Sequence, residues 1–285
     1  MPSRGLLALT LALPALAQSD WQATAGGNIA FDVASVKLSD PAKFRPPTFP
    51  LDAGDSFNAS GGRFFADFPL SVLITFAYKL TLTPEQRQSM MAGQPKWVSD
   101  RYTIEARAEG DPTKDQFRLM MQSLLAERFQ LKVHFETRNV PLLALTLIKP
   151  GKMGPKLRPH SEGPACDAAD DTIFPNRCDV YAMEMQQNRS RILGSRNTTM
   201  DLLASALAGP GSLTRPVVDR TGLTGRFDFT IEWTPDPPPG ADAQPDPQGP
   251  TFIGALHEQL GLKLESTTGD IRVLVIDHAD RPSEN

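Results

Sequence analysis

The chain has 285 residues, a formal net charge of -4 at pH 7, and 40% hydrophobic against 22% charged residues. This composition excludes an intrinsically disordered chain and leaves room for one large domain or two of ordinary size with a packed core. Acidic and basic residues are interspersed, so no extended basic surface forms, and we expect no nucleic acid partner.

The first residues are typical of a secretory signal. Arg4 precedes an apolar run that ends in Ala15-Leu16-Ala17, the small-x-small form that signal peptidase accepts. The run is too short for a transmembrane helix, which needs about 20 apolar residues. We therefore predict a signal peptide over residues 1–17, export to the periplasm or beyond, and no membrane span after cleavage.

A first α+β unit is expected over residues 28–149. Alternating β-branched residues predict strands at 31–39 and 97–108, and between them a short strand leads into a helix with Pro69 in its first turn. The clearest helix follows, because a capping box of Thr113 and Gln116 precedes apolar residues at helical spacing. After this helix we expect two strands joined by a turn around 137–139.

A Gly/Pro-rich connector is expected over residues 150–190. It contains the two cysteines of the chain, Cys166 and Cys178. In an oxidising compartment a pair this close in sequence normally forms a disulfide, which we predict. We expect no metal site, because His160 is the only imidazole nearby and no Cys-x-x-Cys spacing exists.

A second α+β unit is expected over residues 191–285. A short strand precedes a helix capped by Asn197 or Thr198, and two further strands follow. The stretch 234–250 holds seven prolines, which forbid regular structure and predict a stiff, exposed loop. The last elements are a helix that ends at Gly261 and a hairpin that turns at 268–270.

The two units repeat one another. LAERFQLKV, residues 125–133, recurs as LHEQLGLKL, residues 256–264, and the same shift carries LLAL at 142–145 onto VLVI at 273–276. The order of the predicted elements agrees as well. We predict an α+β fold built by tandem duplication of a small mixed β-sheet unit with two helices packed on one face.

Three stretches carry a resemblance to a known family: FDVASVK, PVVDRTGLTGRFDF and LVIDHADRPSEN. In these motifs the chain resembles an uncharacterised family of secreted, soil-associated proteins that contain a domain of unknown function. The resemblance implies export, a shared fold and no assigned reaction. In that family the domain also occurs joined to membrane sensor proteases of the antibiotic-sensing type, which implies a sensing or binding role. Each unit also looks like the short N-terminal domain of secretins and TonB-dependent receptors, a looser likeness that departs at the Pro-rich loop.

The sequence contains none of the common catalytic motifs. The sequence has no Gly-x-Ser-x-Gly elbow, no His-Glu-x-x-His pair, and no phosphate-cradling or dinucleotide-binding glycine pattern. We predict no catalytic residue, no cofactor and no metal. The candidate binding residues are Trp97, whose ring either anchors a loop in the core or offers a stacking face, and Asp219 with Arg220 in a Gly-containing turn.

The leading hypothesis is an exported, non-enzymatic binding protein or adaptor/sensor of unknown ligand, whose partner is an envelope protein or peptide. An exposed sheet edge to which a partner's extended segment adds would suit this role. Two alternatives stay open: an envelope assembly element related to secretin periplasmic domains, and an undetected hydrolase assembled from scattered residues. The sequence assigns no oligomeric state.

Overall fold

The computed structural model describes residues 20–26, 29–43, 45–55, 57–166, 172–187, 189–235 and 249–282. The expected signal peptide and residues 236–248 of the Pro-rich loop lie outside this part of the chain. The described elements mix helices and small sheets, as expected for an α+β fold. None of the described helices is long and apolar enough to cross a bilayer.

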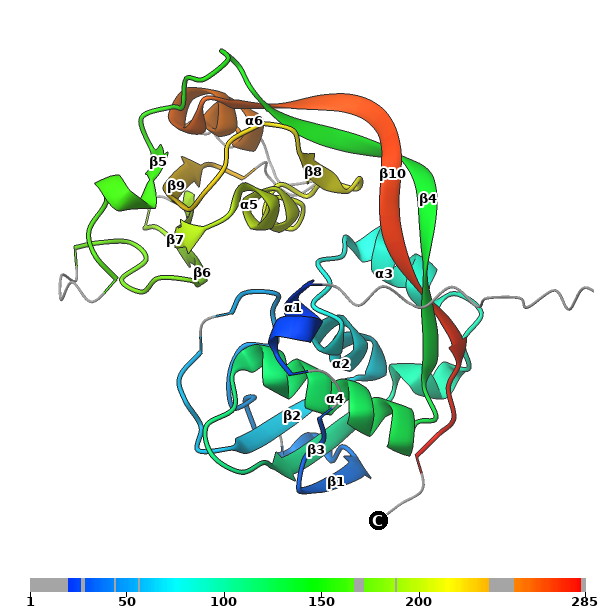
Figure 1. Ribbon diagram of the computed structural model, residues 1–285. Helices are drawn as coiled ribbons and strands as arrows, with labels where there is room; N and C mark the ends of the chain where they lie inside the picture. The colour runs from blue at the N-terminus through cyan, green and yellow to red at the C-terminus, as the bar shows by residue number, and fades with distance from the viewer. Residues whose placement is uncertain are drawn as a thin grey trace, which may run out of the picture.

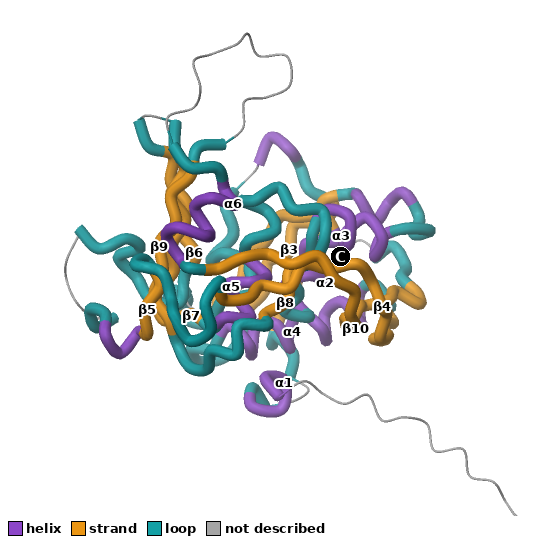
Figure 2. Tube along the Cα trace, turned by 90° about the horizontal axis from the view of Figure 1, so that it is seen from above, coloured by secondary structure: helices purple, strands orange, loops and turns teal. Residues whose placement is uncertain are grey.

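The chain forms two lobes that are connected by a long two-stranded ribbon (Figure 1). We call β4 (Lys132–Leu147) and β10 (Leu262–His278) the ribbon. In Figures 1 and 2 the ribbon runs along the side of the molecule opposite to the β5–β9–β7–β6 sheet. Each lobe packs its own core against its own half of the ribbon.

The first lobe contains a three-stranded antiparallel sheet of order β1-β3-β2, beside which helices α2 and α4 pack together (Figure 1). Its strands are β1 (Val33–Leu38), β2 (Arg63–Pro69) and β3 (Arg101–Arg107). Its helices are α1 (Asp20–Thr24), α2 (Leu70–Ala77), α3 (Pro84–Met91) and α4 (Lys114–Arg128), with short 3-10 turns at Pro41–Lys43 and Lys96–Ser99. The predicted helix at α4 and its capping box of Thr113 and Gln116 are confirmed.

The second lobe contains a four-stranded antiparallel sheet of order β5-β9-β7-β6. The strands of this sheet are β5 (Leu157–Pro159), β6 (Tyr181–Met185), β7 (Arg191–Thr198) and β9 (Phe227–Trp233), and a further strand of the lobe, β8 (Val217–Asp219), pairs with β4 of the ribbon. Its helices are α5 (Met200–Ala206) and α6 (Phe252–Ala255), which continues as a π-helical turn over Leu256–Leu260, and a 3-10 turn spans His160–Glu162. The predicted C-cap at Gly261 is confirmed by its left-handed φ of 69°.

Two local predictions in the second lobe need correction. The N-cap of α5 is Thr199, whose side chain accepts a hydrogen bond from the Leu202 N–H, and not Asn197 or Thr198. Thr198 instead belongs to β7. The segment expected to be only a connector also supplies two strands, β5 and β6, to the second-lobe sheet.

The two predicted hairpins are wrong. Neither 137–139 nor 268–270 is a turn, because β4 and β10 each continue without interruption through these positions. The two long strands pair with each other in antiparallel register, so that the end of β4 enters the second lobe and the end of β10 enters the first. Each half-strand therefore pairs with a strand from the other unit, as in a domain-swapped dimer joined into one chain.

The register of the ribbon has an internal symmetry. Leu125 and Leu256 lie 131 residues apart in the sequence, and the same shift carries Asn139 to Asp270. These two residues are direct partners in the ribbon, where the Asn139 side-chain amide donates to the Asp270 carboxylate at 2.8 Å. The register of the ribbon is thus symmetric about this pair as far as Val133↔Ile276 and its counterpart Leu145↔Leu264, and a bulge between Ile276 and His278 ends the symmetry.

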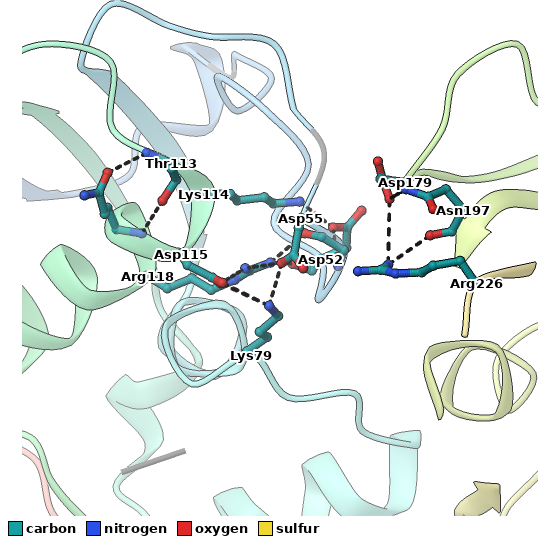
Figure 3. A network of polar contacts seen from close by, with 12 residues as sticks. Asp52, Asp55, Lys79, Thr113, Lys114, Asp115, Arg118, Asp179, Asn197 and Arg226 are labelled. Carbon is teal, nitrogen blue, oxygen red and sulfur yellow. Dashed lines mark hydrogen bonds and ion pairs between the residues drawn. The ribbon is translucent and has the colours of Figure 1, made fainter. Parts of the chain in front are cut away.

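The lobes also meet through the loop that precedes β2. Gly54 of this loop approaches the second lobe closely, since a Cβ added to it would lie 3.2 Å from the Asp179 carbonyl oxygen. The Arg177 guanidinium donates a hydrogen bond to the Asn58 side chain at 3.1 Å. Figure 3 shows the polar groups on both sides of this junction. On the first-lobe side, Arg118 is fully buried and binds Asp55, Asp115 and the carbonyls of the loop.

Candidate functional site

A groove between helix α3 and the ribbon is the most promising site in the described part of the chain. It has a volume of about 300 Å³, at the lower limit of ordinary small-molecule sites. One wall is the outer edge and adjoining face of β10. We call it the α3 groove, and its lining residues are Leu82, Gln86, Ser89, Met90, Ala92, Gln94, Arg138, Val140, Pro216, Ile271 and Val273 to Ile276.

Helix α3 was missed by the sequence reasoning, although a local signal for it exists. Thr83 caps the helix by accepting from the Gln86 N–H, and the Gln86 side chain accepts in return from the Thr83 N–H, which is a capping box with Pro84 in the first turn. The helix has almost no apolar stripe, and Met90 is its one buried residue. A helix so weakly anchored covers the ribbon without filling the space beneath it.

The lining of the α3 groove is mainly aliphatic, with a few amides. The floor is formed by Val273, Val275 and Val140, whose side chains share one face of the ribbon because residues alternate along a strand. Gln94 donates to the Ile276 carbonyl at 3.3 Å. The charged group in the lining is Arg138, whose guanidinium forms an ion pair with the Glu136 carboxylate at 2.9 Å. Such a lining suits an uncharged or weakly polar ligand group.

A second groove lies on the same face of the ribbon in the second lobe. It is more open and polar, has a volume of about 650 Å³, and is lined by Leu142, Ala144, Thr146, Arg220 and residues 265–268. Leu142 and Ala144 are the symmetry counterparts of Val273 and Val275. The two grooves therefore share two equivalent positions on one face of the ribbon and differ in the rest of their lining.

The structure places the predicted binding residues in different lobes. Asp219 ends β8 and accepts the Thr221 N–H at 2.8 Å, so the predicted turn is formed, while Arg220 lies beside it in the more open groove. Trp97 lies in the first lobe and is partly buried against Phe129, with ring centroids 6.4 Å apart. Trp97 thus contacts the core, and it does not line either groove.

A second cluster brings together groups from three segments of the second lobe. His160 Nδ1 lies 2.6 Å from the carboxylate of Asp228, which is buried in β9, and its Nε2 lies 3.4 Å from Cys166 Sγ. The predicted disulfide between Cys166 and Cys178 is present, so neither sulfur is a thiolate. His160 and the two sulfurs are near enough to share a metal ion only after reduction of this bond.

His134 has two carboxylate neighbours on the exposed face of the ribbon. Its Nδ1 lies 2.8 Å from Asp277 and its Nε2 lies 3.1 Å from Glu136. The hydrogen bond to Asp277, followed by the one to Glu136, raises the pKa of His134 above its ordinary value. This imidazole is not part of the lining of either groove, although His134 is the cross-strand partner of Val275 in the floor of the α3 groove.

Comparison with known proteins gives one match. The family described as protein of unknown function (DUF3738) matches residues 71–279. The matched range contains α3, both strands of the ribbon and both grooves. No curated protein and no solved structure matches this chain.

Proposed function

We propose that this chain, which belongs to the DUF3738 family, is an exported, non-enzymatic binding protein or adaptor whose ligand occupies the α3 groove. The observation that carries the proposal is the groove itself, in which a sheet edge and an aliphatic floor are left unfilled beneath a poorly anchored helix. A groove of this size would otherwise be filled by side chains in a well-packed protein.

The chemistry of the groove supports binding over catalysis. Its lining offers aliphatic side chains, the amides of Gln86 and Gln94, and the hydroxyl of Ser89. These groups hold and orient a ligand by contact and hydrogen bonding, but they do not transfer protons near neutral pH. A binding or sensing role is therefore the simplest use of this site.

Export is supported by two features. The small-x-small sequence at Ala15–Ala17 follows a short apolar run, and the disulfide between Cys166 and Cys178 is of a kind that persists in oxidising compartments. We place the protein in the periplasm or outside the cell.

We infer further that the two lobes descend from one duplicated unit. The support is that the sheets β1-β3-β2 and β5-β9-β7 have the same strand order, and that Asn139 pairs with its own counterpart Asp270. In this view the more open groove beside Asp219 and Arg220 is the second copy of the binding face. Trp97 would contribute by fixing the segment that follows α3.

Site-specific photocross-linking in intact cells tests the proposed function. A photoreactive amino acid at Ser89, which lines the groove, is expected to capture a reproducible partner or ligand that mass spectrometry identifies. The matched control is Gln88, its exposed neighbour on α3, which does not line the groove.

Two outcomes would contradict the proposal. One is equal cross-linking from both positions, which would mean that contact is not made through the groove. The other is no cross-link from Ser89 together with an unchanged melting temperature across a ligand panel. Recovery of the chain in the cytoplasmic fraction would contradict the proposed export.

A further inference from the structure

The two outer edges of the ribbon are equivalent by sequence but differ in what covers them. On β4, residues Leu143 to Leu145 pair with β8 in parallel, in the register Leu143↔Val217 and Leu145↔Asp219. The shift of 131 residues carries this edge to Leu274–Ile276 on β10. Within the described residues β10 is the edge of its sheet, so no strand takes the place that β8 takes in the second lobe.

The backbone groups of this β10 segment point outward. On the occupied edge, the Leu143 N–H donates to the Pro216 carbonyl at 2.9 Å, and the Leu145 carbonyl accepts from the Arg220 N–H at 2.9 Å. Hydrogen bonding alternates along a strand, so the counterparts Leu274 and Ile276 also direct their N–H and C=O groups away from β4. The groups needed to pair with another strand are therefore already aligned.

A side chain occupies one of these positions. The Gln94 amide donates to the Ile276 carbonyl at 3.3 Å, and the counterpart of this acceptor, the Leu145 carbonyl, receives the backbone N–H of Arg220. Gln94 thus takes the place of one backbone donor of an added strand. A side-chain amide can rotate away, so this contact does not block the edge.

We infer that the α3 groove receives an extended segment of a partner protein, which adds to β10 as a parallel strand beside Leu274–Ile276. The inference rests on the proposed function and specifies its ligand class. Strand β8 shows what such an occupant requires, because its Val217 is buried in the second core and its Val218 is half-buried. The expected segment is therefore β-branched and apolar over at least two residues.

The groove favours this occupant over a compact small molecule. Its wall includes consecutive residues of β10, from Val273 to Ile276, which presents both the strand edge and the adjoining face. Main-chain hydrogen bonds along such an edge would supply affinity, and the aliphatic floor would select the side chains. A round ligand would leave the outward backbone groups without partners, which costs free energy.

A synthetic peptide with the sequence of β8 and its flanks, LTRPVVDRT (residues 213–221), is a direct probe. We expect the fluorescently labelled peptide to bind the full chain, measured by anisotropy, and to slow amide exchange of Leu274 and Ile276. Ser89→Trp should weaken this binding at least tenfold by filling the groove, whereas Gln88→Trp on the same helix should leave it unchanged. Both variants change exposed helical positions, and circular dichroism would verify that they fold.

A second peptide separates strand addition from other binding in the groove. Parallel pairing places the Val218 N–H opposite the Leu143 carbonyl, so N-methylation of Val218 in the peptide removes that bond but keeps the side chains. Loss of binding on N-methylation supports strand addition. Equal binding of both peptides, blocked by Ser89→Trp, would overturn it while leaving the proposed function intact.

Two further results would also overturn the inference. The first is no binding of the peptide although photocross-linking at Ser89 captures a small molecule. The second is concentration-dependent self-association of the chain that Ser89→Trp abolishes, because the occupant would then be a second copy.

Discussion

The two lobes place equivalent segments of one ribbon in different surroundings. In the second lobe the edge at Leu143–Leu145 is completed by β8, and the lobe is cross-linked by the Cys166–Cys178 disulfide. In the first lobe the edge at Leu274–Ile276 faces the α3 groove, and the buried Arg118 forms an ionic cluster with Asp55 and Asp115. Within the described residues, the lobe with the uncovered strand edge is thus the one without a disulfide, so the two halves of one ribbon are stabilised in different ways.

The largest expected effect comes from breaking the ionic cluster of the first lobe. Arg118→Ala leaves the carbonyls of Asp52 and Gly54 without this donor, and it leaves the carboxylates of Asp55 and Asp115 with Lys79 as their remaining ionic partner in the cluster. We expect the free energy of unfolding to fall by about 3 kcal/mol, at the lower limit for breaking a buried ion pair because Asp55 is half exposed. Urea denaturation measures this change.

The control for that change is Arg107→Ala, which removes an exposed arginine from β3 in the same lobe. Its effect should stay within about 0.5 kcal/mol. A loss for Arg118→Ala no larger than that for the control would show that the cluster does not hold the loop in place.

Removal of the disulfide is the matching experiment on the second lobe. Replacing Cys166 and Cys178 together by serine opens a loop with a sequence separation of 12 residues. The chain-entropy estimate for such a loop is a loss of about 3 kcal/mol. Amide hydrogen exchange should show the loss of protection in β6, β7 and β9.

The same exchange data test whether the lobes are independent. Protection of α2 and α4 should be kept in the serine variant, since their core is separate from that of the second lobe. An equal loss in both lobes would mean that they unfold as one unit, and the comparison between them would lose its basis.

Local and long-range features of the fold differ in what the sequence discloses about them. The helix α4 and the disulfide were predictable, because a capping box, helical spacing and a close cysteine pair are all local signals. The ribbon was not predictable in the same way. Alternation of apolar residues is the same in a hairpin and in a continuous strand, so the pattern around 137–139 and 268–270 did not distinguish them.

The α3 groove was not predictable from the sequence for a related reason. It depends on the pairing of β4 with β10 across more than a hundred residues and on α3, whose sequence PEQRQSMM has little apolar periodicity. Asp228 beside His160 is another long-range contact, made by strand β9. The sequence is compatible with Trp97 in the core or on a binding face, and the packing of its ring on Phe129 favours the core.

The open edge should be visible in the exchange rates of single amides in the unliganded protein. Leu143 and Leu274 are counterparts with similar exposure, 8% and 5%, but only the Leu143 N–H has a strand partner on the outer side within the described residues. We expect the Leu274 amide to exchange about tenfold faster, which corresponds to one net hydrogen bond.

Ala144 and Val275 serve as the matched control for this measurement. Their N–H groups point inward to the other ribbon strand, so their exchange rates should be similar. Equal protection of Leu143 and Leu274 would indicate that α3 seals the edge, and the groove would then not admit a strand.

The smallest expected effect concerns the charges at the two ends of the ribbon. His134 beside Asp277 has a raised pKa, whereas its counterpart Glu265 has a pKa lowered by the hydrogen bond and charge of Lys263. The His134 contribution to stability is present below its unfolded pKa, near 6.5, and is lost as the pH rises through the folded value. The Glu265 contribution is present above its unfolded pKa, near 4.5, and is lost as the pH falls through the folded value. Between pH 8 and 6, acidification should therefore stabilise the first-lobe end of the ribbon and leave the second-lobe end unchanged.

An NMR titration of His134 tests this directly, since Asp277→Asn should lower the pKa of His134 while Lys263→Gln should leave it unchanged. An unaltered titration in Asp277→Asn would show that the contact does not persist in solution, and the exposed ends of the ribbon would then contribute nothing to the difference between the lobes.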